Sequence, residues 1–269
     1  MKDTLQPYLI DSEPYYRATG LEVDLFESAY ARRLPIILKG PTGCGKTRFL
    51  EHMAWRLRKP LVTVACNEDL SASDLVGRYL LDPSGTVWHD GPLTLAVRHG
   101  AICYLDEVVE ARADTTVVIH PLADDRRILP IDRRAERVRA HRDFQLVMSY
   151  NPGYQRASKD LKISTRQRFV SLDFHYPEAT MEAEIVMRES GIDRETAQKL
   201  VGIAQQSRAL RGHGVDEGIS TRMVVRAAML IADGMAAHAA CRIAMTRPVS
   251  DDAEVLSALD GFVDAFFGP

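Results

Sequence analysis

The chain has 269 residues, of which 46% are hydrophobic and 26% charged, so it can bury one large core or two smaller ones. Its formal net charge of −3 provides no global basic field for nucleic acid. The first residues lack the apolar core of a signal peptide, and no apolar run approaches the roughly 20 residues that span a bilayer. The four cysteines show no CxxC spacing, which favours reduced thiols over a metal site or disulfide. We therefore expect a cytoplasmic protein that binds neither nucleic acid nor membranes.

The first half of the chain alternates short apolar runs with helical segments. LPIILKG at 34–40 is typical of a buried strand, and the amphipathic segment 47–58 predicts a helix. Further strands are predicted at 61–66, 101–107, 144–151 and 169–174. Strands separated by helices in this way indicate an α/β fold with a parallel sheet and crossover helices.

The pattern changes after about residue 176, where helical periodicity replaces strand-like runs. The proline and acidic residues near 175–180 suit the start of a helix. We therefore predict an α/β domain over residues 1–176 and a small all-α domain over 177–269. Its predicted helices cover 181–189, 194–210, 220–235 and 236–245.

The first predicted strand runs directly into a phosphate-binding motif, GPTGCGKT at 40–47, which fits G-x-x-x-x-G-K-[ST]. Its glycines allow backbone N–H groups to curl around phosphate oxygens, and the following helix adds its positive N-terminus. The Lys46 ammonium would reach the β- and γ-phosphates, and the Thr47 hydroxyl would ligate Mg²⁺. The alternative is a glycine-rich turn with a solvated lysine. The predicted nucleotide-binding residues are Gly40, Pro41, Thr42, Gly43, Cys44, Gly45, Lys46 and Thr47.

Two carboxylates, Asp106 and Glu107, end the apolar run AICYLDE. The carboxyl edge of a parallel sheet is where ligands of such folds bind. We predict that Asp106 binds Mg²⁺ through a water molecule and that Glu107 polarises the attacking water, which favours ATP hydrolysis over transfer to a small acceptor. The alternative is that both acids simply begin a helix, where the dipole also favours them.

Asn151 ends the predicted strand 144–151, in the sequence SYNPGY. Its amide could hydrogen-bond the lytic water or the γ-phosphate. The alternative is that Asn-Pro-Gly forms a turn, and both interpretations can hold together.

These motifs, followed by an arginine-bearing segment and a helical domain, resemble the ordered pattern of AAA+ ATPases, and within them the MoxR branch. Longer strings are similar to the CbbQ/NirQ/NorQ group, and most closely to its CbbQ-type members. The resemblance extends from residue 14 to the end of the chain. The strings that carry it include GPTGCGKTRF (40–49), CNEDLSASDLVGRYLLD (66–82), YLDEVVEARADTTVVIHPL (104–122) and GHGVDEGISTR (212–222).

The resemblance implies an ATP- and Mg²⁺-dependent ring, typically a hexamer, that remodels a client protein together with a von Willebrand factor A domain partner. For CbbQ-type members the partner is CbbO-like and the client is inhibited Rubisco. The alternative is a NorQ/NirQ-type role in the maturation of nitric oxide reductase with a NorD-like partner. A second class of function is a small-molecule P-loop kinase, which would need a lid and an acceptor pocket and would do without Glu107 and Arg222 as placed. A third is a non-hydrolysing nucleotide-binding scaffold.

Three arginines occupy positions that the resemblance associates with catalysis. In STRQRF (164–169), Arg168 matches the arginine finger of a neighbouring subunit, and Arg166 is the second choice. In STRM (220–223), Arg222 matches the sensor 2 position, where it would contact the γ-phosphate of its own subunit. The alternative for each is a surface salt bridge worth about 0–1 kcal/mol.

Two further segments are predicted to form hairpins. In the first, the turn Asp82–Gly85 joins two runs whose Tyr79, Leu80, Leu81 and Trp88 would contact a client or partner, unless the aromatics pack on their own domain. The second, 126–142, carries seven arginines and two acids but no aromatic that could stack on a base. It favours a solvated hairpin or a subunit-interface strand.

Overall fold

The computed structural model describes residues 3–83, 85–152, 161–212 and 215–268. Ser84 of the predicted hairpin turn and Gly153 of the Asn-Pro-Gly sequence lie outside these residues. The chain forms two compact units: Met1–Gly40 with Lys46–Asp173, and Pro41–Gly45 with Phe174–Pro269. Among the described residues, every helix is too short or too polar to cross a membrane.

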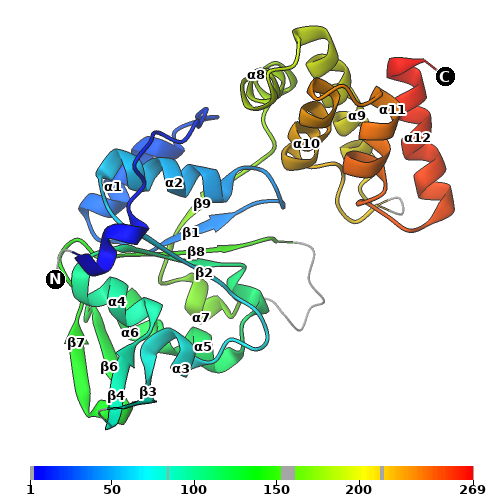
Figure 1. Ribbon diagram of the computed structural model, residues 1–269. Helices are drawn as coiled ribbons and strands as arrows, with labels where there is room; N and C mark the ends of the chain where they lie inside the picture. Colours follow the sequence, from blue (N-terminus) through cyan, green and yellow to red (C-terminus); the bar gives the residue numbers. More distant parts are fainter. Residues whose placement is uncertain (1–2, 84, 153–160, 213–214, 269) are drawn as a thin grey trace. The chain divides into compact units, whose positions relative to one another are not determined.

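A five-stranded parallel sheet forms the centre of the first unit (Figure 1), in the order β2-β5-β8-β1-β9. The predicted α/β fold with a parallel sheet is therefore confirmed. Each predicted strand is present, although shorter by one to three residues. The strands are β1 (Ile36–Lys39), β2 (Leu61–Ala65), β5 (Ile102–Asp106), β8 (Gln145–Tyr150) and β9 (Val170–Asp173).

The central strands are buried on both faces, which explains their near-continuous apolar runs. Every residue of β8 is buried, whereas the edge strand β2 has two exposed residues. In Figure 1, α1 and α2 cover one face of the sheet, and α4, α6 and α7 lie on the other.

The predicted helix 47–58 is α2 (Lys46–Leu57), and α1 (Glu22–Ala31) has no counterpart in the sequence analysis. The other helices of this unit are α3 (Ala72–Val76), α4 (Pro92–His99), α5 (Ala113–Val118), α6 (His120–Ala123) and α7 (Ile163–Arg166), with 3₁₀ turns at Asp3–Tyr8, Val108–Glu110 and Asp132–Arg134.

Both predicted hairpins are present: β3 (Gly77–Asp82) pairs with β4 (Gly85–Asp90), and β6 (Ile128–Ile131) pairs with β7 (Glu136–Arg139). Arg98 on α4 holds them together, since its guanidinium pairs with Asp90 at 2.9 Å and with Glu136 at 2.7 Å. The arginine-rich segment is thus a hairpin packed beside another hairpin.

The four candidate contact residues of the first hairpin behave differently. Leu81 is 87% exposed and Leu80 39%, so the apolar tip is accessible. The rings of Tyr79 and Trp88 pack edge to face at 5.2 Å, and the Trp88 indole N–H donates to Asp90 at 2.7 Å. The two leucines therefore remain candidates for partner contact, whereas Trp88 packs on its own hairpin.

The second unit is helical. Its helices are α8 (Ala179–Ser190), α9 (Arg194–Ala209), α10 (Thr221–Ala232), α11 (Ala237–Cys241) and α12 (Ala253–Phe267). The segment predicted as helical over 236–245 consists of α11 followed by a π-helical turn at Arg242–Thr246, and α12 was not predicted. Within the described part of this unit, the β structure consists of one isolated bridge between Arg211 and Val215.

All four cysteines are free and buried. Burial raises the pKa of Cys66, Cys103 and Cys241 to about 12, so these three remain neutral thiols at pH 7. The prediction that the thiols are buried is confirmed.

Candidate nucleotide-binding site

The motif 40–47 joins β1 to α2 as a strand–loop–helix, which is the context a phosphate-binding loop requires. Gly45 has φ +103° with open space around it, a conformation that side-chain-bearing residues rarely adopt. Lys46 begins α2, and its ammonium donates to the carbonyl of Gly40 at 2.8 Å. The loop thus carries backbone N–H groups at a helix N-terminus, which favours binding of an anion.

Asp106 ends β5 with one carboxylate oxygen fixed by two hydroxyls. Its Oδ1 accepts from the Tyr104 hydroxyl at 2.5 Å and from the Ser149 hydroxyl at 2.5 Å. Tyr104 is fully buried, and this burial, reinforced by the adjacent Asp106 charge, raises its pKa well above the usual range. Tyr104 therefore stays protonated and donates. A hydrogen bond with the Thr47 side chain lowers the pKa of Tyr104 in turn. Thr47 therefore lies beside the Tyr104 hydroxyl.

Tyr104 and Ser149 were missed by the sequence analysis. Tyr104 precedes Asp106 by two residues on one strand, and alternate residues of a strand share a face, so this signal was available. Ser149 lies on the neighbouring strand β8, and its approach to Asp106 depends on the register of β5 with β8.

Glu107 follows Asp106 in a left-handed backbone conformation, with φ 54° and ψ 46°. Such a conformation costs a residue other than glycine of order 1–3 kcal/mol, and residues of this kind cluster at functional sites. The Glu107 backbone N–H donates to the Ser149 hydroxyl at 3.1 Å, and the residue is exposed. The carboxylate therefore extends from a fixed backbone into solvent next to Asp106.

Asn151 directly follows β8 and is partly buried. Because the carboxyl ends of parallel strands meet at one edge, β1, β5 and β8 bring Lys46, Thr47, Asp106, Glu107 and Asn151 to the same edge of the sheet. The first-unit residues of the predicted site therefore gather where ligands of such sheets bind.

The donor groups at this edge suit Mg²⁺. Hydroxyl and carboxylate oxygens such as those of Thr47 and Asp106 are hard ligands, and Mg²⁺ is commonly held by one or two protein groups with phosphates and waters. No cluster of three or more His, Cys, Asp or Glu side chains is found in the described part of the chain. A dedicated all-protein metal site is thus not seen in those residues, whereas a nucleotide-associated ion fits.

Arg166 and Arg168 lie elsewhere. Ser164, Thr165 and Arg166 form part of the short helix α7. Both arginines precede β9, at the amino edge of the sheet, roughly 13 Å along a four-residue strand from the carboxyl edge. The structure therefore separates them from Asp106 of their own chain.

Asp124 holds Arg168 in place. The Arg168 Nε donates to Asp124 Oδ1 at 2.8 Å, and a terminal nitrogen donates to the carbonyl of Ser164. Arg126 pairs with the other Asp124 oxygen at 2.6 Å. The hydrogen bond from Arg126, with the bond and charge of Arg168, lowers the pKa of Asp124 despite its partial burial. The carboxylate thus stays ionised at neutral pH, and Arg168 remains one-third exposed.

Arg222 lies in the second unit, exposed in the first turn of α10. Ser220 caps this helix by accepting a hydrogen bond from the Met223 N–H at 3.4 Å. A cation is disfavoured beside the positive end of a helix dipole, so helix stability does not explain an arginine here. A Cβ placed on Gly43 would lie 3.2 Å from the Cβ of Arg222, so this loop glycine packs against the Ser-Thr-Arg turn.

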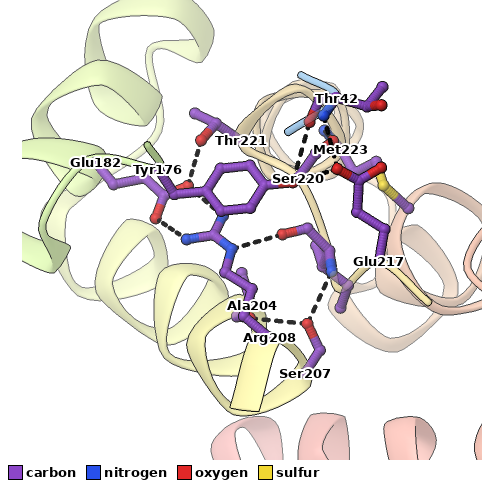
Figure 2. A network of polar contacts seen from close by, with 11 residues as sticks. Thr42, Tyr176, Glu182, Ala204, Ser207, Arg208, Glu217, Ser220, Thr221 and Met223 are labelled. Carbon is purple, nitrogen blue, oxygen red and sulfur yellow. Dashed lines mark hydrogen bonds and ion pairs between the residues drawn. The ribbon is translucent and has the colours of Figure 1, made fainter. Parts of the chain in front are cut away.

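Residues 41–45 of the loop make polar contacts within the second unit (Figure 2). The Thr42 N–H donates to Glu217 Oε1 at 2.6 Å, and the Tyr176 hydroxyl donates to the Thr42 carbonyl at 3.0 Å. The sequence analysis assigned no role to Tyr176 or Glu217. No local pattern marks either residue, because they lie 134 and 175 positions from Thr42.

Two family models match the chain. One, for the AAA domain of the dynein-related subfamily, covers residues 35–169. The other, for the CbbQ/NirQ/NorQ C-terminal region, covers residues 182–266.

Similar proteins cover almost the whole chain. Protein CbbQ of Hydrogenophilus thermoluteolus is 62% identical over 98% of this chain and 99% of its own length. Protein NorQ of Paracoccus denitrificans is 60% identical over 95% of this chain and 94% of its own. The denitrification regulatory protein NirQ of Pseudomonas aeruginosa is 56% identical over 94% of this chain and 98% of its own.

Solved structures support the fold. A mutant of RuvB from Thermotoga maritima superposes with a TM-score of 0.55 at 15% identity, over 91% of this chain and 72% of that one. A putative ATPase from Cytophaga hutchinsonii gives a TM-score of 0.52 at 14% identity, over 93% of this chain and 89% of that one. With the family models and the full-length relatives, the chain belongs to the CbbQ/NirQ/NorQ family of AAA+ ATPases.

Proposed function

We propose that this protein hydrolyses ATP in a homo-oligomeric, hexameric ring and uses the energy to reactivate inhibited Rubisco together with a CbbO-like von Willebrand factor A domain partner. The observation that carries the ATPase proposal is the gathering of Lys46, Thr47, Asp106 and Glu107 at one sheet edge, beside a phosphate-binding loop. We take residues 1–176 as the ATPase domain and 177–269 as the small helical domain.

Each residue at the sheet edge has a proposed task. The loop 40–47 binds the phosphates through its N–H groups, with Lys46 on the β- and γ-phosphates. Thr47, and Asp106 through a water molecule, would hold Mg²⁺, which would neutralise charge on the phosphates. Tyr104 and Ser149 orient Asp106 for this task. Glu107 orients and polarises the attacking water, and Asn151 hydrogen-bonds that water or the γ-phosphate.

The arginines complete the site in two ways. Arg168, at the opposite edge of its own sheet, acts on the nucleotide of a neighbouring subunit, with Arg166 assisting. Arg222 contacts the γ-phosphate bound by its own chain. Because the Arg168 cation meets the charge developing on a phosphoryl group bound by the neighbouring subunit, it lowers the barrier only when the ring is assembled. Hydrolysis thereby becomes conditional on assembly.

The choice of client follows the resemblance to CbbQ-type proteins, supported by 62% identity to a CbbQ over nearly the full length. A NorQ of 60% identity supports the second candidate, maturation of nitric oxide reductase with a NorD-like partner. Both candidates use the same ATPase machinery and differ in the client.

Glu107→Gln in a reactivation assay tests the proposal. Wild-type protein with a CbbO-like partner and ATP should release the tight-binding sugar phosphate from inhibited Rubisco and restore carboxylation. Glu107→Gln should still bind ATP but lose most of its turnover, because an amide cannot polarise the water, and should fail to reactivate Rubisco.

Two results would contradict this proposal. Unchanged turnover in Glu107→Gln would refute the role of that carboxylate. Failure of the wild type on Rubisco, together with ATP-dependent activation of nitric oxide reductase through a NorD-like partner, would replace the first client by the second. Glu195→Gln, on the exposed face of α9, is the matched control for a carboxylate-to-amide change.

A further inference from the structure

Both backbone polar groups of Thr42, its N–H and its carbonyl, are hydrogen-bonded, although the residue itself is exposed. Glu217 accepts its N–H at 2.6 Å, and the Tyr176 hydroxyl donates to its carbonyl at 3.0 Å (Figure 2). The same hydroxyl approaches Glu217 Oε1 at 3.5 Å, so the three groups lie close together. Tyr176 and Glu217 thus fix the backbone of Thr42, which directly precedes Gly43 in the phosphate-binding loop.

Tyr176 is itself fixed by a stacked cation. The Arg208 guanidinium lies 3.9 Å from the centre of the Tyr176 ring. Two nitrogens of this guanidinium donate to the Glu182 carboxylate at 2.7 and 2.6 Å, and Glu182 is completely buried. A bidentate pair of this kind restricts both side chains geometrically. The Tyr176 ring therefore packs on a rigid surface, and its hydroxyl has a defined direction.

The same network determines the position of the Ser-Thr-Arg turn. The Thr221 hydroxyl donates to Glu182 at 2.6 Å, and Arg208 Nε donates to the carbonyl of Ile219 at 2.8 Å. A Cβ on Gly43 would lie 2.7 Å from the Ser220 hydroxyl oxygen, so the loop and the turn are in close contact. Movement of either one disturbs the other.

We propose that Tyr176 and Glu217 are positioning residues for the nucleotide: they fix the Thr42 peptide so that the N–H groups of residues 43–45 are already directed at phosphate before it binds. Through Arg208 and Glu182, the same contacts keep the turn that carries Arg222 in register with the loop. A preorganised site loses less conformational entropy on binding, which strengthens affinity without a new contact to the ligand. This inference rests on the proposed ATPase function.

Three substitutions separate positioning from a general structural role. Tyr176→Phe removes the hydroxyl and leaves the ring that Arg208 stacks on. Glu217→Ala removes the acceptor of the Thr42 N–H, whereas Glu217→Gln keeps an oxygen that can accept it. Binding of a fluorescent ADP analogue and of ATP is measured by titration, and steady-state hydrolysis gives KM and kcat.

The expected result is a roughly 3- to 10-fold weaker nucleotide affinity for Tyr176→Phe and for Glu217→Ala, the effect of losing one hydrogen bond. Glu217→Gln should recover most of the lost affinity. The losses should appear in KM rather than in kcat at saturating ATP, because neither side chain touches the reacting phosphate. Glu195→Ala and Glu195→Gln on exposed α9 should match the wild type, and thermal melts report whether each variant is folded.

Unchanged affinity in Tyr176→Phe and Glu217→Ala would overturn the proposal. Tighter binding in both Glu217 variants would also overturn it, since the carboxylate would then be opposing the anionic nucleotide. Lys46→Ala distinguishes a failure of the inference from a failure of the proposed function. If Lys46→Ala binds nucleotide like the wild type, the loop is not the nucleotide site and the ATPase proposal itself fails.

Discussion

At the scale of single residues, Arg168 combines two features that suit a residue acting on another subunit. It is held against its own chain by Asp124 at 2.8 Å, yet one-third of its side chain remains exposed. It also lies at the amino edge of the sheet, away from the carboxylates of its own chain. A partly exposed pair of this kind contributes little to stability, so its loss should be visible in catalysis rather than in folding.

We expect Arg168→Ala to lower kcat by roughly 10³- to 10⁵-fold, the range known for arginine fingers, with little change in nucleotide affinity. Steady-state hydrolysis and nucleotide titration on the assembled protein measure the two quantities. Arg166→Ala is the comparison and should have a smaller effect on kcat. A loss of affinity as large as the loss of kcat would show that Arg168 supports binding and is not a finger.

At the scale of elements, the buried pair between Glu182 and Arg208 joins α8 to α9, and Thr221 adds α10. Glu182 is fully buried and the Arg208 side chain is only 15% exposed. Removing one member of such a pair leaves an uncompensated charge in the interior, which is far more costly than the pair itself is stabilising.

Arg208→Met should therefore destabilise the helical unit by about 3–5 kcal/mol. Urea denaturation followed by circular dichroism measures the loss, and hydrogen exchange in α8–α10 assigns it to these helices. Arg194→Met, at the exposed start of α9, is the matched control and should change stability little. Equal stability of the two variants would mean that the pair is not a structural element of this unit.

At the scale of the whole molecule, the proposed ring makes activity depend on concentration. If Arg168 of one subunit acts on the nucleotide of the next, an isolated subunit lacks a catalytic group. The dependence of activity on protein concentration would therefore be a property of the assembled ring and not of a single subunit.

We expect the ATPase rate per subunit to fall steeply on dilution as the ring dissociates, and light scattering at each concentration should follow the same curve. Mixing Arg168→Ala with Glu107→Gln subunits should restore part of the activity, because some interfaces then combine an intact Glu107 with an intact Arg168. A rate per subunit that stays constant on dilution, or a mixture no more active than its components, would exclude action between subunits.

Much of the fold could be predicted because it is recorded in local patterns. The apolar runs of β1, β5 and β8 mark strands buried on both faces, and the capped amphipathic segments mark α9 and α10. Local patterns do not distinguish one type of helix from another: the helical periodicity over 236–245 continues from α11 into a π-helical turn without a change in the sequence pattern. In STRQRF the sequence gives no signal that separates a helix from the loop after it.

The sequence by itself determined the family, the parallel sheet and the motif residues from Gly40 to Thr47, because residue type and spacing are sufficient to specify a phosphate-binding loop between a strand and a helix. Only the tertiary structure decided which side chains orient that chemistry. Tyr104 and Ser149 on Asp106, and Tyr176 and Glu217 on Thr42, are such partners. Three of these four contacts join residues 43 to 175 positions apart. Strand register and helix packing create contacts over such separations, and they leave no periodicity in the sequence from which the partner could be read.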